Sequence, residues 1–475
     1  MQRRNFLIGM ANTAIGIGVA AGARAQVPIN ARIAISYEGA GGEIPADFIG
    51  LSFESAVLAD PGYFTPDNTS VLGLIRLLGP NGVIRIGGNT SERTVWRARD
   101  APVPPGSFVP TPASIDRLAA VLRILGWKLI YGLNLARGTP ETAAEEAAYV
   151  ARAIGSNLLA FQIGNEPDGF GRWTAVRPGT YDAAAFLTEW RAVHAAIRAR
   201  LPDARFAGPD VAAETGWVGI LAKESPAGLV LLTRHYYADG PAGAPHVSLE
   251  RLLRSDQQIE PVLDELARIS RTYHLPFRIA EANSVFGEGQ RGVSDTFGAA
   301  LWGLGLMFRL AAAGAAGVNV HTGVHNLRPG EDKAYTPITR GTAGRYRAAP
   351  VYYGMLMFAR AAQGTLVPAR VAADTADLKA YAVHAADGRL RVTLINQNAG
   401  QGARVSINPG RAFTSASVLR LTAPSLDATA GVTLGGASVD DFGRWDPVEE
   451  VLRPGGAEVV VDLPAPGAAI VTVAG

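Results

Sequence analysis

The 475-residue chain contains no cysteine, and this absence excludes disulfides, thiolate zinc sites and cysteine nucleophiles. Charged residues are also few, at 18% of the chain, and 44 Lys and Arg nearly balance 42 Asp and Glu. The resulting net charge of +2 gives no electrostatic reason to expect a nucleic acid partner. Stability must therefore come from packing, and the ligand is not expected to be rich in phosphate.

Apolar residues make up 48% of the chain, with 55 Gly and 30 Pro, which is typical of a folded, loop-rich protein. The length exceeds what one hydrophobic core usually supports. We therefore expect either one large domain with a smaller one, or two domains of similar size.

The N-terminus has the pattern of an export signal. Arg3 and Arg4 precede Phe-Leu and an apolar stretch that ends in Ala23-Arg24-Ala25, an A-x-A cleavage pattern. Residues 1–25 are therefore predicted to be a twin-arginine signal peptide, which places the mature protein in the periplasm or outside the cell without a membrane anchor. An uncleaved anchor is the alternative, disfavoured by the small residues and the cleavage pattern. Residues 297–320 are also apolar, but Arg309 interrupts them, and we predict a buried helix and strand there.

Eight short apolar runs alternate with amphipathic stretches through the first two thirds of the chain. Continuous apolar strands separated by helices predict a parallel sheet covered on both faces, and eight such units predict a closed (β/α)8 barrel. The runs are residues 51–54, 82–87, 128–135, 158–164, 205–208, 228–233, 277–280 and 317–321, and helical spacing marks residues 114–125, 142–154, 182–200 and 260–274.

The pattern changes after residue 362 to alternating, turn-rich strands. Asp387-Gly388 between two such strands predicts a hairpin, and the remaining runs predict a β-sandwich. Residues 31–44 also have strand character and are predicted to complete this sandwich. The expected organisation is a signal at 1–25, N-terminal strands at 26–50, a catalytic barrel at 51–364 and a β-sandwich domain at 365–475.

Two glutamates stand at the ends of barrel strands four and seven. Glu166 follows Gly164-Asn165, and Glu281 follows Ala280. The carboxyl ends of barrel strands form the active-site face, and retaining glycosidases need two carboxyls about 5–5.5 Å apart. Glu166 is predicted to be the general acid/base and Glu281 the nucleophile, although a helix-capping Glu166 and an ion-paired Glu281 are the structural alternatives.

Neighbouring residues have plausible supporting roles. By strand order, Tyr237 can donate a hydrogen bond to Glu281 and keep it ionised, with plain barrel filling as its alternative. Asn165 can bind the sugar 2-hydroxyl. His235 and His321 lack metal-ligand spacing and are expected to be core histidines, so we predict no metal and no cofactor.

An ordered set of motifs resembles glycoside hydrolase family 79, the family of β-glucuronidases and heparanases, from about residue 30 to the C-terminus. The motifs are Arg-Ile-Gly-Gly-Asn-Thr-Ser-Glu at 85–92, Tyr-Gly-Leu-Asn-Leu at 131–135, Gly-Asn-Glu-Pro-Asp at 164–168, His-Tyr-Tyr at 235–237 and Glu-Ala-Asn-Ser at 281–284. The resemblance implies the same roles for the two glutamates and a substrate-binding role for a further set of residues. This set is Asn165, Tyr237, Asn283, Tyr335, Glu54, Asn89, Asn134 and Phe286, with loop capping as the alternative for Asn89 and Asn134.

The same resemblance implies a uronic acid carboxylate in the site, bound by backbone amides after the nucleophile and by tyrosine hydroxyls. Tyr335 matches one of these tyrosines, whereas the other falls at Phe286, which has no hydroxyl. Losing one hydrogen bond to a charged group costs about 1.5–3 kcal/mol, unless Arg291 or Arg328 supplies a contact instead.

The sequence therefore predicts a retaining exo-β-glucuronidase that acts on glycans carrying terminal β-linked glucuronic acid. Three alternatives keep the fold: a neutral or 4-O-methylated sugar as substrate, endo action like that of heparanase, or a carbohydrate-binding protein without activity. An exported redox enzyme is disfavoured by the missing cysteines and the lack of a usable nucleotide loop. Oligomeric state is not encoded in any recognisable pattern.

Overall fold

The computed structural model of the protein describes residues 28–96, 104–324, 332–373, 375, 377–453 and 456–475. The predicted signal peptide and Arg328 lie outside these residues. Over the described part of the chain, no helix combines the length and the apolar character needed to cross a membrane.

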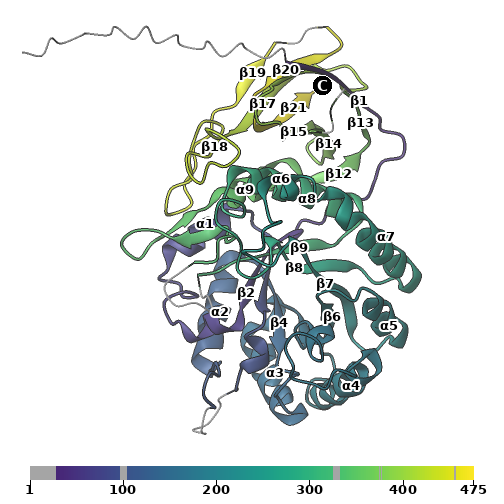
Figure 1. Cartoon of the computed structure of the whole chain (residues 1–475), viewed down its shortest axis with the longest axis vertical. Helices are drawn as coiled ribbons and strands as arrows, with labels where there is room; N and C mark the ends of the chain where they lie inside the picture. The colour runs from purple at the N-terminus through teal and green to yellow at the C-terminus, as the bar shows by residue number, and fades with distance from the viewer. Residues whose placement is uncertain (1–27, 97–103, 325–331, 374, 376, 454–455) are drawn as a thin grey trace, which may run out of the picture.

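The larger unit is a closed barrel of eight parallel strands, which confirms the predicted fold class (Figure 1). Each strand pairs with the next along the chain, and the first pairs with the last to close the barrel. The strands are β2 Ile49–Glu54, β3 Val83–Gly87, β4 Lys128–Leu133, β5 Leu158–Ile163, β6 Phe206–Val211, β7 Leu229–Asp239, β8 Phe277–Val285 and β9 Gly317–His321.

Helices connect the strands and surround the barrel. They are α1 Thr69–Leu77, α2 Pro112–Leu125, α3 Pro140–Ile154, α4 Ala183–Arg200, α5 Gly216–Glu224, α6 Leu249–Leu253, α7 Asp256–Tyr273, α8 Phe297–Ala312 and α9 Pro350–Ala361. Local sequence sets their ends. Helix α2, for example, begins after Thr111, whose side chain accepts a hydrogen bond from the Ser114 amide, has proline as its first residue, and ends at Gly126 with φ of 75°.

Strands β7 and β8 extend further than the apolar runs predicted. The runs end at residues 233 and 280, whereas the strands continue to Asp239 and Val285. Their parallel register sets His235 opposite Glu281 and Tyr237 opposite Asn283. These polar residues interrupt the apolar runs, yet their backbones remain paired, so the candidate catalytic side chains stand on regular strands rather than on loops.

The smaller unit is a sandwich of two sheets. The first has the order β13-β1-β16-β20, and the second has the order β12-β14-β15-β21-β17-β18, with β19 also paired to β17. The N-terminal strand β1 pairs with both β13 and β16, as predicted for the N-terminal segment. The bounds are β1 Ile29–Ile35, β12 Gly364–Val367, β13 Ala369–Ala372, β14 Leu378–Ala385, β15 Leu390–Asn396, β16 Ala403–Asn408, β17 Ser415–Thr422, β18 Thr433–Leu434, β19 Glu450–Leu452, β20 Val459–Leu463 and β21 Gly467–Ala474. A separate hairpin joins β10 Ile338–Arg340 to β11 Tyr346–Ala348.

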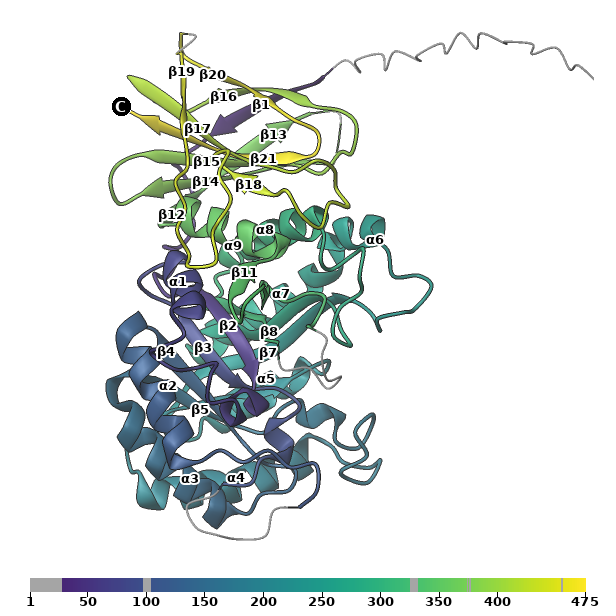
Figure 2. The same ribbon diagram turned by 90° about the vertical axis from the view of Figure 1, so that its left-hand side faces the viewer.

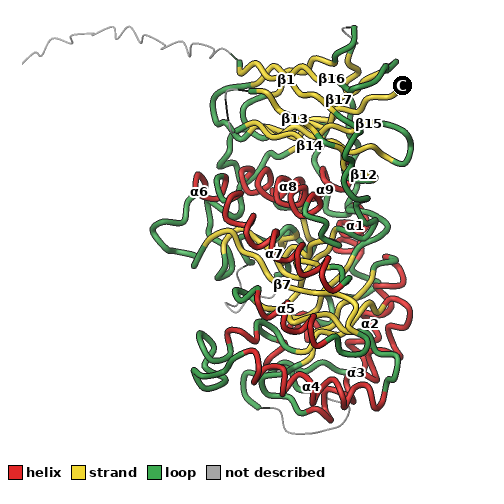
Figure 3. Tube along the Cα trace, turned by 90° about the vertical axis from the view of Figure 1, so that its right-hand side faces the viewer, coloured by secondary structure: helices red, strands yellow, loops and turns green. Residues whose placement is uncertain are grey.

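Helices α8 and α9 lie between the sandwich and the barrel (Figures 2 and 3). On α8, the ring of Phe308 stacks on Tyr381 of β14 with centroids 4.7 Å apart. The Phe297 and Gly298 amides at the start of α8 donate hydrogen bonds to the carbonyls of Ala428 and Leu426 in a sandwich loop. Since α8 follows strand β8, the sandwich fixes a helix that supports the Glu281 strand.

Candidate active site

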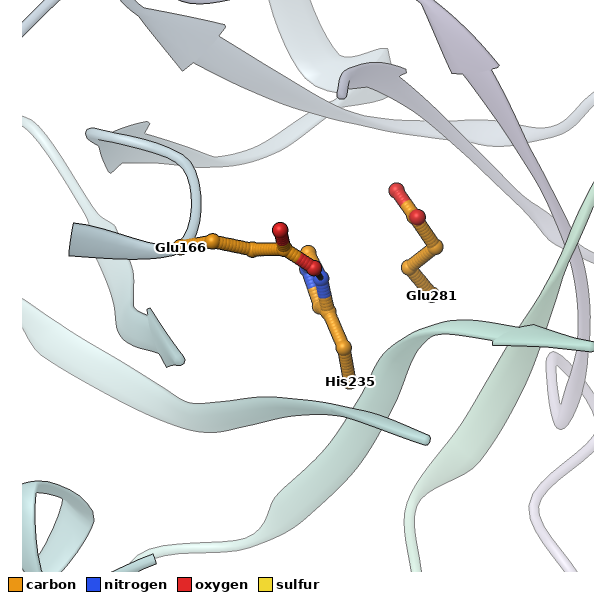
Figure 4. A group of neighbouring side chains, drawn as sticks. All are labelled: Glu166, His235 and Glu281. Atoms are coloured by element: carbon orange, nitrogen blue, oxygen red, sulfur yellow. Dashed lines mark hydrogen bonds and ion pairs between the residues drawn. The ribbon is translucent and has the colours of Figure 1, made fainter. Parts of the chain in front are cut away.

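Glu166 and Glu281 meet at the mouth of the barrel together with His235 (Figure 4). One carboxylate oxygen from each glutamate and one ring nitrogen of His235 all lie within 4.8 Å of one another. The Glu166 side chain is 15% exposed and that of Glu281 is 7% exposed. Two nearly buried carboxyl groups at this separation can flank a single anomeric carbon, one as a proton donor and one as a nucleophile.

The Glu166 backbone has a conformation that few non-glycine residues adopt. Its φ is 48°, and that of Asp210, at the end of the neighbouring strand β6, is 65°. The Glu166 amide donates a hydrogen bond to the Asp210 carbonyl at 2.9 Å. A left-handed backbone conformation costs about 1–2 kcal/mol at a non-glycine residue, and such strained residues cluster at active sites.

Arg85, on strand β3, is the centre of a buried hydrogen-bond network and is only 1% exposed. Its guanidinium donates to Glu281 at 2.7 Å, to Asp210 at 2.5 Å, to the side-chain oxygen of Asn165 at 2.6 Å and to that of Gln162 at 3.0 Å. Burial alone would lower the pKa of Arg85, but the charges of Asp210 and Glu281 raise it. Arg85 thus links the nucleophile candidate to the strand end that carries the acid candidate.

Glu281 is surrounded by groups that favour its ionised form. Besides Arg85, the Tyr237 hydroxyl donates to one carboxylate oxygen at 2.7 Å, and a ring nitrogen of His321 lies 2.9 Å from the same oxygen. Burial opposes ionisation, but His321, His235 and Arg85 outweigh it and hold the pKa of Glu281 well below its ordinary value. The predicted hydrogen bond from Tyr237 is present.

The pKa of Glu166 is shifted in the opposite direction. Burial raises its pKa, and the hydrogen bond from His235 at 2.9 Å only partly offsets that effect. His235 also lies 3.1 Å from Asp210. Burial disfavours its charge, but Asp210 and Glu281 raise the pKa of His235 to about 10. The two glutamates therefore differ as a general acid and a nucleophile must.

Glu166, His235 and Glu281 are also the described residues whose donor atoms are close enough to share a metal ion. The positive charges at this point disfavour a bound metal ion. His235 carries a raised pKa, and the Arg85 guanidinium already occupies one Glu281 oxygen at 2.7 Å. A cation at this point would face both of these positive groups.

Four other predicted substrate contacts lie around this centre. The Asn165 side chain accepts from Arg85 and donates to the side-chain oxygen of Asn89 at 3.3 Å, and Asn89 is exposed. Tyr335 is buried, with its hydroxyl 3.2 Å from a ring nitrogen of His321. Glu54 accepts two hydrogen bonds from Thr90, through its amide and its hydroxyl.

Two predicted contacts have other partners in the structure. The Asn134 oxygen accepts from the amides of Arg137 and Gly138, and its nitrogen donates to a loop carbonyl. This is the loop-capping role given above as the alternative. The Asn283 side chain donates to the carbonyls of His321 and Tyr335 and accepts from the next amide, so it joins strand β8 to the segment that carries Tyr335. Both amides support the loops rather than facing an open position.

Phe286 follows strand β8 and is 46% exposed. Its ring lies against Gly240, where an added Cβ would come within 2.4 Å of the ring. Arg291, suggested as a substitute carboxylate contact, bonds instead to the carbonyl of Asp332 and, at 3.4 Å, to Asp295.

The sandwich and the full chain both match known glycoside hydrolases. Residues 380–470 match the model of the glycosyl hydrolase family 79 C-terminal beta domain. The chain is 26% identical to a beta-glucuronidase of Aspergillus niger over 95% of this chain and 94% of that protein. By this C-terminal domain and its full-length similarity to the Aspergillus enzyme, the chain resembles glycoside hydrolase family 79. A beta-glucuronidase of Neurospora crassa is also 26% identical, over 63% of this chain and 59% of that protein.

Solved structures share the fold of this chain. A 4-O-alpha-L-rhamnosyl-beta-D-glucuronidase from Fusarium oxysporum superposes with a TM-score of 0.76 at 20% identity, over 93% of this chain and all of that one. A GH51 arabinofuranosidase from Xanthomonas axonopodis pv. citri superposes with a TM-score of 0.68 at 16% identity, over 94% of this chain and all of that one. These structures share the barrel and the sandwich described above, whereas the family 79 domain match and the beta-glucuronidase relatives identify the protein as a glycoside hydrolase.

Several residues of this glycoside hydrolase were missed from the sequence. The predicted site did not include Arg85, Asp210 or Lys333, whose amine lies 2.9 Å from His321 and 3.5 Å from Glu54. His235 and His321 were expected to be ordinary core residues. One signal was present: Arg85 stands inside an apolar run that was predicted to be a buried strand, and a buried arginine needs carboxylate partners.

Proposed function

We propose that this enzyme is a retaining exo-β-glucuronidase of family 79, which releases terminal β-linked glucuronic acid from glycans through a covalent intermediate on Glu281. The observation that carries the proposal is the pair of carboxyl oxygens within 4.8 Å, one group with a raised pKa and the other with a lowered one. The beta-glucuronidase relatives support the sugar. Arg3-Arg4 and Ala23-Arg24-Ala25 support export to the periplasm or the exterior.

In the proposed first step, Glu281 attacks the anomeric carbon while Glu166 gives its proton to the leaving oxygen, so that a glycosyl ester forms and the aglycone departs. In the second step, Glu166 removes a proton from water as the water attacks the same carbon, and Glu281 is released. Arg85 and Tyr237 hold the Glu281 carboxylate through hydrogen bonds to both of its oxygens, leaving it ionised and oriented for attack.

The test compares initial rates on nitrophenyl β-glucuronide, β-glucoside and β-xyloside, and follows the first-formed sugar by proton NMR. The β-glucuronide should be hydrolysed fastest, and the β-anomer should appear first. Faster turnover of a neutral glycoside contradicts the sugar, and an α-anomer contradicts retention. E166Q and E281Q should each lower kcat by several orders of magnitude. E146Q is the matched control, because Glu146 is equally buried but bonds to Tyr131, outside the catalytic group.

A neutral sugar is the second candidate, and Phe286 favours it. The side chain at this position offers no hydroxyl to a uronate carboxylate. Arg291 does not replace it, because its guanidinium bonds to Asp332 and Asp295 instead. The same rate comparison decides between the two candidates.

A further inference from the structure

Three tryptophan or phenylalanine side chains of the described residues are exposed: Trp173 at 50%, Phe286 at 46% and Phe442 at 36%. Exposed single apolar residues are common, so exposure alone indicates nothing. Position distinguishes Trp173, because it lies seven residues after Glu166, in the segment that leads from the acid/base candidate to helix α4.

A chain of backbone hydrogen bonds ties Trp173 to Glu166. The Glu166 carbonyl accepts from the Gly169 amide at 2.9 Å, and the Gly169 carbonyl accepts from the amides of Arg172, Trp173 and Thr174 at 3.0–3.2 Å. The Thr174 hydroxyl donates to the same carbonyl. A turn built in this way holds the backbone of Trp173 close to that of Glu166.

The indole covers Gly169 and leaves its remaining surface to solvent. A Cβ added at Gly169 would lie 2.3 Å from the indole ring, so any larger residue here would displace the indole. Other aromatic residues of the same segment turn inward: Phe170 is buried and packs on Tyr181. Among the described residues, Trp173 has no ring partner of this kind.

The reaction mechanism indicates which part of the substrate lies beside Trp173. The general acid protonates the oxygen of the leaving group, so the segment that follows Glu166 flanks the leaving group rather than the sugar that is attacked. An exposed indole presents a flat apolar face, which suits the face of another ring.

We propose that Trp173 is a binding platform for the leaving group and stacks on its first ring, whether a sugar or an aromatic aglycone. The proposal rests on the proposed function for the role of Glu166. It does not depend on the identity of the sugar that is released.

The experiment compares the full-length enzyme with W173A on three glucuronides that differ only in leaving group: glucuronyl fluoride, nitrophenyl glucuronide and a disaccharide with glucuronic acid linked to a neutral sugar. W173A should lower kcat/KM for the two ring-bearing substrates by on the order of tenfold, with much less effect on the fluoride, which has no ring to stack. W173F should recover most of the loss. F442A, the matched exposed aromatic on the sandwich, should behave as wild type on all three.

An equal loss on all three substrates, or no loss on any, would overturn the proposal. A different result would contradict the proposed function: the wild type would hydrolyse the glucosyl counterparts faster than the glucuronides. The same three leaving groups on glucose would test the platform in that case, because the argument concerns only the leaving-group side.

Discussion

Replacing Arg85 by methionine should destabilise the protein in a pH-dependent way. The guanidinium is the cation beside two buried carboxylates, Asp210 and Glu281, and methionine keeps an unbranched apolar stem but has no charge and no donor. Removing one partner of a buried ion pair costs about 3–5 kcal/mol, because the remaining charge stays buried without a counter-charge. This is a large part of the roughly 5–15 kcal/mol that holds a typical domain folded.

The sign of the pH dependence follows from the protons bound. In the wild type the pKa values of Asp210 and Glu281 are lowered, so neither binds a proton near neutral pH. Without Arg85, burial raises their pKa values, and the folded variant takes up a proton that the unfolded chain does not bind. A group with a raised folded pKa loses its stabilising effect as pH rises through that pKa, so the unfolding free energy of R85M should fall by up to about 1.4 kcal/mol per pH unit above pH 5.

Urea unfolding of R85M and wild type between pH 5.5 and 8 measures this difference. R278M is the matched control: Arg278 is equally buried, but its partners are Asn319 and backbone carbonyls, which carry no charge. R278M should be destabilised by an amount that hardly changes with pH. Equal pH dependence in the two variants would refute the assignment of Arg85 as the counter-charge of these carboxylates.

Three further predictions concern activity. Y237F removes the hydroxyl that donates to Glu281, so the pKa of Glu281 should rise and the acidic limb of the kcat/KM profile should move to higher pH; an unmoved limb contradicts this. Burial raises the pKa of Glu92 to about 7, and this side chain accepts a hydrogen bond from the backbone amide of Asn165, the residue before Glu166, at 2.5 Å. Since Glu92 helps to position the acid/base, E92Q should lower kcat more than it changes KM in steady-state kinetics. F286Y adds one donor near the nucleophile strand and should raise the ratio of kcat/KM on glucuronide to that on glucoside by roughly tenfold or more, whereas an unchanged ratio places the uronate elsewhere.

The barrel and the two glutamates could be predicted from the sequence for a common physical reason. Buried parallel strands must be continuously apolar, and polar residues that end such strands collect at one face, so the chain order of Glu166 and Glu281 fixes their meeting point. The hairpin at Asp387-Gly388 was equally local, because the turn needs the positive φ of 80° that Gly388 adopts.

The charge network could not be predicted in the same way. Arg85, Asp210 and His235 stand on strands β3, β6 and β7, and nothing local in the sequence says which of them touch. The roles of Asn134 and Asn283 show the same limit: an asparagine near a strand end can face a substrate or bind a backbone, and only the loop geometry decides between them. Pairings across the barrel are long-range contacts, which a pattern of apolar residues does not encode.

Together with burial, the balance of charge explains why the pKa of Glu166 is raised. Arg85, which contacts Glu281, and His235, which contacts Glu166, supply two positive charges, and Asp210 and Glu281 supply two negative ones. His321 also lies 2.9 Å from Glu281, but burial lowers its own pKa, so it is counted as neutral here. Arg85 pairs with both Asp210 and Glu281, while His235 is shared between Asp210 and Glu166. Ionising Glu166 as well would leave one buried negative charge without compensation, and its raised pKa reflects that cost. The cations that keep Glu281 ionised are already paired with Asp210 and Glu281. The different pKa shifts of the acid and the nucleophile therefore arise from one network rather than from two separate environments.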